Sequence, residues 1–125
     1  MILTGLGGKV FSDRHATDSA RLINAIQPDY LSTLVLSFPY GIAHYKNRFE
    51  GDFEVMSVTD LLSEQYRFIS GINVSNVVFR SDHASNYFAL KGILSRDKDM
   101  MLSALETAIH HPDQAVLREE WQRGL

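Results

Sequence analysis

Cysteine is absent from this chain of 125 residues, and proline occurs only three times. The lack of cysteine excludes disulfide bonds and thiolate metal sites within the chain, including an iron–sulfur cluster held by the usual cysteine ligands. Because a chain without cysteine suits a reducing compartment, we expect a cytoplasmic protein.

Long apolar runs and an excess of positive charge are also missing. No stretch reaches the roughly 20 apolar residues of a membrane helix, and the first residues show no signal-peptide pattern. The formal net charge is −3, so the composition predicts no nucleic-acid surface. With 45% hydrophobic and 22% charged residues, the sequence is typical of a soluble globular protein. We expect residues 1–125 to form a single domain.

The spacing of apolar residues predicts strands that alternate with helices. The expected strands lie within residues 1–6, 30–38 and 73–79. The expected helices lie within residues 12–27, 57–71 and 95–111. Ser57 and Asp60 match a capping box at the start of the second helix. Pro112 is expected to begin a short terminal helix within residues 112–125, with Trp121 as its core contact.

This order predicts an α/β fold with about three parallel strands. The runs 34–36 and 77–79 are continuously apolar, which is typical of strands covered on both faces. The predicted helices, however, suffice to cover only one face. Residues 39–56 and 80–94 are expected to be irregular.

Three unusual segments follow the predicted strands: a glycine-rich turn at residues 5–8, Pro-Tyr-Gly at 39–41, and a polar stretch from Arg80. In parallel α/β folds, ligands bind at the carboxyl ends of the strands. The sequence therefore predicts a small-molecule site at this edge.

The polar stretch from Arg80 contains most of the candidate functional side chains. Arg80 suits contact with a substrate carboxylate or phosphate. His83 is the candidate general acid or base, and Asp82 is a candidate to fix its tautomer. Asn86 and Tyr87 can bind either the substrate or the backbone. In the alternative interpretation, this stretch is a loop whose polar side chains satisfy its own backbone, and we expect a mixture of the two.

The glycine turn has two interpretations. Gly5, Gly7 and Gly8 either admit a ligand close to the backbone or make a tight strand-to-helix turn. The turn matches neither the dinucleotide fingerprint nor the phosphate-loop motif. The histidines form no metal-binding pair with helical spacing, and we expect no metal site made by this chain alone.

Three stretches carry a resemblance to a known family. They are LTGLGGKVFSDR (residues 3–14), LSFPYGIAHY (36–45) and FRSDHASNYFALKGILSRDKD (79–99). Together they resemble the C-terminal part of the barrel of radical S-adenosylmethionine Fe–S oxidoreductases. The resemblance extends over about residues 1–110. It implies a partial TIM-like barrel with an open lumen face.

The resemblance also implies roles for residues. Leu3, Gly5, Gly7 and Gly8 would lie near the adenosyl group. The loop with Arg80, Asn86 and Tyr87 would face the substrate. S-adenosylmethionine and a 4Fe–4S cluster are implied for the complete enzyme, but this chain lacks the cluster-binding cysteines and is expected to be inactive alone.

Two other functions stay open at this stage. The chain can be a stand-alone module that binds a phosphorylated or carboxylated small molecule, or a subunit that docks on a partner carrying the cluster. For a barrel section, we expect either an N-terminal barrel half as partner or self-association through the lumen face or the sheet edge.

Overall fold

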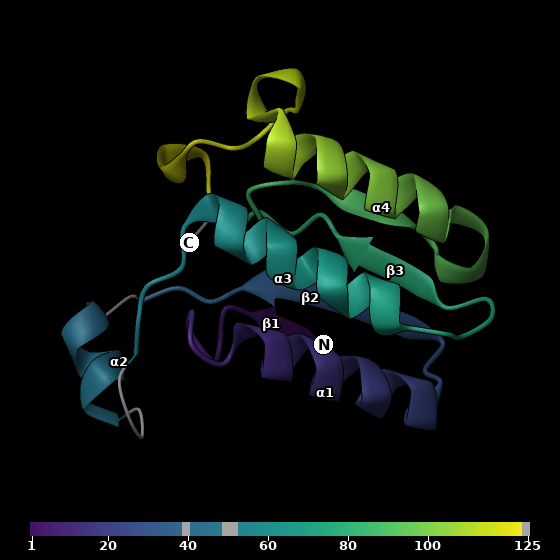
Figure 1. The fold of residues 1–125 in the computed structure, drawn as a ribbon, viewed down its shortest axis with the longest axis horizontal. Helices are drawn as coiled ribbons and strands as arrows, with labels where there is room; N and C mark the ends of the chain where they lie inside the picture. The colour runs from purple at the N-terminus through teal and green to yellow at the C-terminus, as the bar shows by residue number, and fades with distance from the viewer. Residues whose placement is uncertain (39–40, 49–52, 124–125) are drawn as a thin grey trace.

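The computed structural model describes residues 1–38, 41–48 and 53–123, and it shows helices packed on a four-stranded sheet (Figure 1). The strands are β1 (Ile2–Thr4), β2 (Tyr30–Val35), β3 (Val78–Ser81) and β4 (Leu90–Ile93). The helices are α1 (Ser12–Ile26), α2 (Ile42–Arg48), α3 (Val58–Gly71) and α4 (Leu94–His110), followed by 3₁₀ turns at Pro112–Gln114 and Glu120–Gln122. The predicted α/β class is confirmed.

The sheet is open and mostly parallel, with the strand order β1-β2-β3-β4. As predicted, β1 pairs with β2 and β2 pairs with β3 in parallel, with Leu3 opposite Leu34 and Leu31 opposite Phe79. The fourth strand corrects the prediction of an irregular segment over residues 80–94, because β4 pairs antiparallel with β3. A short return loop permits an antiparallel neighbour, whereas a parallel neighbour needs a longer crossover.

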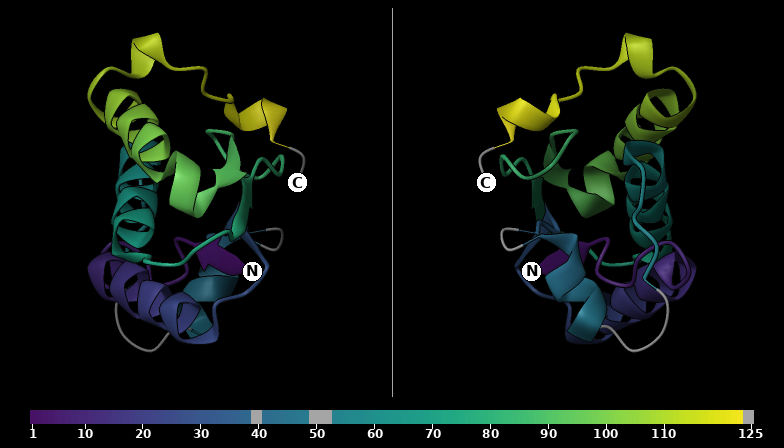
Figure 2. Two further views of the ribbon diagram at one scale, coloured as in Figure 1. Left: turned by 90° about the vertical axis from the view of Figure 1, so that its right-hand side faces the viewer. Right: turned by 90° about the vertical axis from the view of Figure 1, so that its left-hand side faces the viewer.

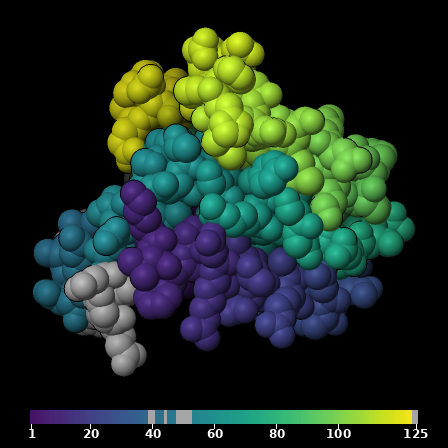
Figure 3. Space-filling model, in the orientation of Figure 1, coloured from purple at the N-terminus to yellow at the C-terminus, as the bar shows by residue number. Residues whose placement is uncertain are grey.

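Helices α1, α3 and α4 all lie on one face of the sheet (Figure 2). In the space-filling view of that side, their side chains form a continuous surface (Figure 3). The strands alternate accordingly: β2 buries Leu31, Thr33 and Val35, whereas Tyr30 is 76% exposed. The apolar runs predict that both faces of the sheet are covered, but the described helices cover only one of them.

We call the opposite side of the sheet the open face. Side chains alternate along each strand, so the open face carries those that point away from the helices. They are Leu3, Tyr30, Ser32, Leu34, Val78, Arg80, Lys91 and Ile93.

The core lies between the sheet and its three long helices. α3 begins with the predicted capping box: Asp60 N–H donates to Ser57 Oγ over 3.1 Å, and Ser57 N–H donates to Asp60 Oδ2 over 3.0 Å. The cap starts the helix at a position that places its apolar stripe on the sheet. The fully buried core side chains include Leu31, Ile69, Phe79, Leu94, Met101 and Leu105.

Several local predictions are wrong or untested. α2 lies inside the segment 39–56 that is predicted to be irregular, and the predicted turn at Pro39 and Tyr40 lies outside the described residues. The predicted terminal helix is instead two 3₁₀ turns joined by an extended segment, and Trp121 is 81% exposed. Contacts of this segment with the loop after β3 replace the internal bonds of a helix.

Candidate functional site

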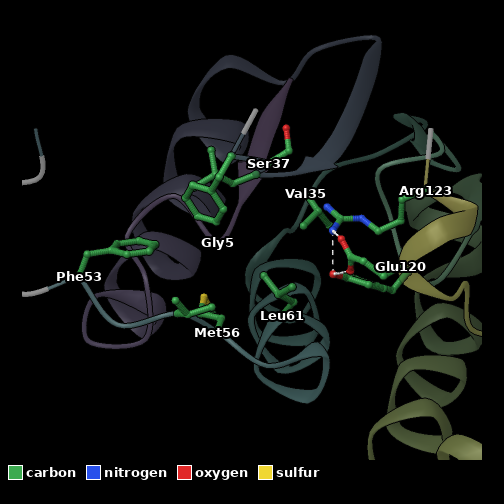
Figure 4. Close-up of a pocket in the computed structure, with 12 residues that line it drawn as sticks. Gly5, Val35, Ser37, Phe53, Met56, Leu61, Glu120 and Arg123 are labelled. Carbon is green, nitrogen blue, oxygen red and sulfur yellow. Dashed lines mark hydrogen bonds and ion pairs between the residues drawn. The ribbon is translucent and has the colours of Figure 1, made fainter. Parts of the chain in front are cut away.

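A cavity of about 220 Å³ lies where β1 and β2 end. Its apolar wall comes from the end of β2 and from the residues that precede and begin α3 (Figure 4). Its polar end comes from the loop after β3 and from the last 3₁₀ turn. The apolar wall comprises Val35, Leu36, Phe38, Phe53, Val55, Met56 and Leu61, and the remaining lining residues are Gly5, Ser37, Tyr87, Glu120 and Arg123.

A buried carboxylate holds the glycine turn at the rim of this cavity. Gly5 N–H donates to Glu64 Oε1 over 2.9 Å, and Ser12 Oγ–H donates to Glu64 Oε2 over 2.8 Å. Glu64 belongs to α3 and is only 2% exposed. Beside it, His15 Nε2 lies 2.8 Å from the Leu3 carbonyl oxygen. These contacts fasten the turn to two helices.

The glycines of the turn make room for the chain itself. Gly5 has a φ of +89°, and a Cβ there would lie 2.9 Å from Leu61 Cδ2. At Gly8, where φ is +65°, a Cβ would lie 2.8 Å from Phe53 Cδ2, and at Gly7 it would lie 2.8 Å from Phe11 Cβ. Of the four residues expected near the adenosyl group, only Gly5 lines the cavity, and Leu3 lies on the open face. The tight-turn interpretation therefore accounts for these glycines.

A buried polar network fixes the loop after β3 to β2. Asn86 Nδ2 donates to the Thr33 carbonyl oxygen over 3.0 Å and to the His83 carbonyl oxygen over 3.2 Å, while its Oδ1 accepts from Ser81 Oγ over 3.2 Å. Gln65 Nε2 of α3 donates to Ser81 Oγ over 2.7 Å. Asn86 is 2% exposed, so its amide serves the loop backbone.

Arg80, Asp82 and His83 lie outside the cavity. Arg80 Nη1 lies 3.3 Å from Asp82 Oδ2, on the open face. Ser85, and not Asp82, orients His83: Ser85 N–H donates to His83 Nδ1 over 3.1 Å, and Ser85 Oγ lies 2.9 Å from the same atom. Because a backbone N–H can only donate, Nδ1 is the acceptor in this contact. The expected pairing of Asp82 with His83 is replaced by these contacts.

The C-terminal segment completes the site, and the sequence prediction missed it. Arg118 Nη1 donates to the carbonyl oxygens of His83 and Asn86 over 3.0 Å and 2.7 Å. Arg123 Nε donates to the Ser85 carbonyl oxygen over 2.9 Å, and its Nη1 donates to the Tyr87 hydroxyl over 2.7 Å. Two arginines thus bind the segment to the loop after β3.

Tyr87 belongs to a short chain of charge-assisted bonds at the polar end. Its hydroxyl donates to Glu120 Oε2 over 2.5 Å, and the Arg123 guanidinium lies 4.4 Å from its ring centre. Burial, and then the bond to Glu120, raise the pKa of Tyr87 to about 12. The same bond lowers the pKa of the Glu120 carboxyl. Both shifts keep the tyrosine protonated and the glutamate charged around neutral pH.

We therefore expect the bond between Tyr87 and Glu120 to be lost in strong alkali. A tyrosine whose pKa is raised by folding contributes stability below its ordinary value of 10.0, and this contribution is lost as the pH rises through about 12. The difference in tyrosinate absorbance between wild type and Tyr87→Phe should develop near pH 12. A blocked tyrosine amide in the same buffer gives the reference, with its ordinary pKa of about 10. A Tyr87 difference that develops at the same pH as this reference would contradict the expectation.

Within residues 1–38, 41–48 and 53–123, no group of three or more histidine, aspartate or glutamate side chains is placed to hold a metal ion. Among the helices in these ranges, none has both the length and the apolar character that crossing a membrane requires.

Comparisons with family models, curated proteins and solved structures give no match to this chain.

Proposed function

We propose that this chain is one section of a larger α/β barrel, of the kind built by radical S-adenosylmethionine oxidoreductases, and that it supplies a wall of a small-molecule site. One observation carries the proposal: a mostly parallel sheet has its long helices on one face only (Figure 2). In a barrel, the outer face of the sheet carries the helices and the inner face encloses the centre. The family resemblance of the three sequence stretches adds to this argument.

The open face has the side chains that such a role requires. Leu3 and Leu34 are paired neighbours on β1 and β2, and Val78 and Ile93 are paired neighbours on β3 and β4. These apolar pairs form two patches, and Arg80 and Lys91 lie opposite one another beside the second patch. A mixed surface of this kind suits an enclosed lumen that holds a polar ligand better than it suits a surface in water.

The 4Fe–4S cluster and S-adenosylmethionine, which the resemblance implies, differ in how well the residues of this chain suit them. A 4Fe–4S cluster needs thiolate ligands, and the chain has no cysteine, so the cluster would have to be held elsewhere. For S-adenosylmethionine, Gly5 is the one expected contact that borders the cavity. We therefore propose that the chain alone neither takes up a cluster nor cleaves S-adenosylmethionine. A cluster absorbance band after anaerobic reconstitution with iron and sulfide would overturn this.

Association through the open face is the most direct test. The chain alone should form dimers or larger species in sedimentation velocity, because apolar area removed from water contributes about 25 cal/mol per Å². Leu34→Lys should give monomers, since it places a charge at the centre of the sheet. Leu22→Lys is the matched control, because Leu22 is 52% exposed on α1 and should leave the association unchanged.

A clean monomer at high concentration would contradict the barrel-section proposal. It would favour the second candidate, a stand-alone module that binds a small carboxylate or phosphate. One observation speaks for that candidate: the cavity contains the guanidinium of Arg123, whose side chain is 6% exposed. Co-purification with a cluster-bearing chain would instead favour a docking subunit.

A further inference from the structure

We propose that the cavity between the glycine turn and the last 3₁₀ turn binds a small apolar monocarboxylate, with the carboxylate held by Nη2 of Arg123. The proposal goes beyond the role as a barrel wall, and it narrows the carboxylate or phosphate of the second candidate function to one ligand class and one binding atom. It rests on one unsatisfied cationic group and on the surfaces around it.

Arg123 is the central observation. Its side chain is 6% exposed, and its Nε and Nη1 atoms are satisfied by the Ser85 carbonyl oxygen, the Tyr87 hydroxyl and Glu120 Oε1. Its Nη2 is buried and has no hydrogen-bond partner among the residues that the structure describes. Buried polar groups are almost always paired, and an unpaired charged donor is costly. Nη2 is therefore a buried donor whose acceptor lies outside the described residues, and the ligand carboxylate would supply that acceptor.

The guanidinium is held rigidly at the polar end of the cavity. Its central carbon lies 4.4 Å from the centre of the Tyr87 ring, and Glu120 Oε1 lies 2.7 Å from Nη1. In Figure 4 the guanidinium extends from the last 3₁₀ turn toward Val35 on the cavity wall. Nη2 is buried, so an incoming acid must shift the side chains that flank it. The ligand would bind end-on, because the other nitrogens are already occupied.

The cavity wall selects the rest of the ligand. Phe53, Phe38, Met56 and Leu61 provide an apolar surface opposite the polar end, which suits an aromatic or aliphatic body. The volume of about 220 Å³ limits that body to a small molecule. Glu120 already balances the charge of Arg123, so a monoanion is favoured over a dianion such as a phosphate monoester.

Calorimetric titration of the chain with three probes tests the ligand class without any variant. The probes are benzoate, benzyl alcohol, which keeps the ring but lacks the carboxylate, and inorganic phosphate, which lacks the ring. Benzoate should bind at least about tenfold more tightly than either of the others, the factor expected for one charge-assisted hydrogen bond. Equal binding of the alcohol, equal binding of phosphate, or no binding of benzoate would each overturn the proposal.

Two variants test the residue. Arg123→Lys keeps a positive charge but removes Nη2, so benzoate affinity should fall about tenfold or more. Arg96→Lys is the matched control, because Arg96 is 70% exposed on α4 and should leave the affinity unchanged. Circular dichroism checks that both variants are folded. Unchanged benzoate affinity in folded Arg123→Lys would overturn the assignment.

The titrations should be repeated in the Leu34→Lys background. The open face and the cavity have no lining residue in common, so benzoate binding should persist in that variant whether or not the wild-type chain associates. Loss of benzoate binding in folded Leu34→Lys would count against a site formed by this chain alone. Failure of association would leave the cavity proposal intact, and failure of benzoate binding would leave the barrel proposal intact.

Discussion

Glu64→Ala is expected to destabilise the fold by about 2–4 kcal/mol, because it leaves two donors without their acceptor. Gly5 N–H and Ser12 Oγ–H both donate to this carboxylate, which is 2% exposed. Urea denaturation measures the free energy of unfolding. Glu106→Ala on the exposed side of α4 is the control and should change that free energy by about 0.5 kcal/mol or less.

Glu64→Gln removes the carboxylate group but keeps a hydrogen-bond acceptor at the same position. The glutamine carbonyl oxygen can still accept from Gly5 N–H, and Ser12 Oγ can turn to accept from the new amide. We therefore expect a smaller loss than for alanine, about 1 kcal/mol. If Glu64→Ala were as stable as Glu106→Ala, the turn would not depend on this carboxylate. Since Gly5 lines the cavity, the alanine variant should also weaken benzoate binding.

The order of elements was the most predictable part of the fold. The helical spacing in α1, α3 and α4 and the capping box at Ser57 are local signals, and local signals do not depend on how the chain packs. The parallel pairing of the three predicted strands followed from their alternation with helices. The prediction of α/β class therefore needed no knowledge of long-range contacts.

The missed elements lack local signals. β4 is only four residues long and contains a lysine and a glycine, so its pairing with β3 depends on the loop that returns the chain. The sequence around Trp121 reads as a helix, but Arg118 and Arg123 hold the segment to the loop after β3 in another conformation. Tertiary contacts override local propensity in both places.

The cavity lies at the strand-end edge of the sheet where the sequence predicts a small-molecule site, and its role in binding stays a prediction. Of the residues proposed for ligand contact, Gly5 and Tyr87 line this cavity. Glu64 had a detectable signal, since a carboxylate four residues before Phe68 falls on the buried face of α3. No local sequence signal marks Arg123, because its contacts depend on where the end of the chain folds back.

Asn86→Ala is expected to cost about 2–4 kcal/mol and to release the loop after β3. The substitution leaves the Thr33 carbonyl oxygen and the Ser81 hydroxyl without their partner in a buried network. Asn73→Ala is the control, because Asn73 is exposed and its backbone N–H, which the substitution keeps, donates to Asn24 Oδ1. Equal free energies of unfolding for the two variants would contradict the loop-anchor role.

Asn86→Asp makes the sharper test of that role. Aspartate keeps an acceptor for Ser81 Oγ but turns a carboxylate oxygen toward the Thr33 and His83 carbonyl oxygens, where the amide now donates. A buried charge facing two acceptors costs more than a missing group, so Asn86→Asp should be less stable than Asn86→Ala at neutral pH. Arg118 and Arg123 also donate hydrogen bonds to carbonyl oxygens of this loop. Release of the loop should therefore free the C-terminal segment. Limited proteolysis should then cleave that segment faster in both variants than in Asn73→Ala, and equal cleavage rates would show that the segment is held independently of Asn86.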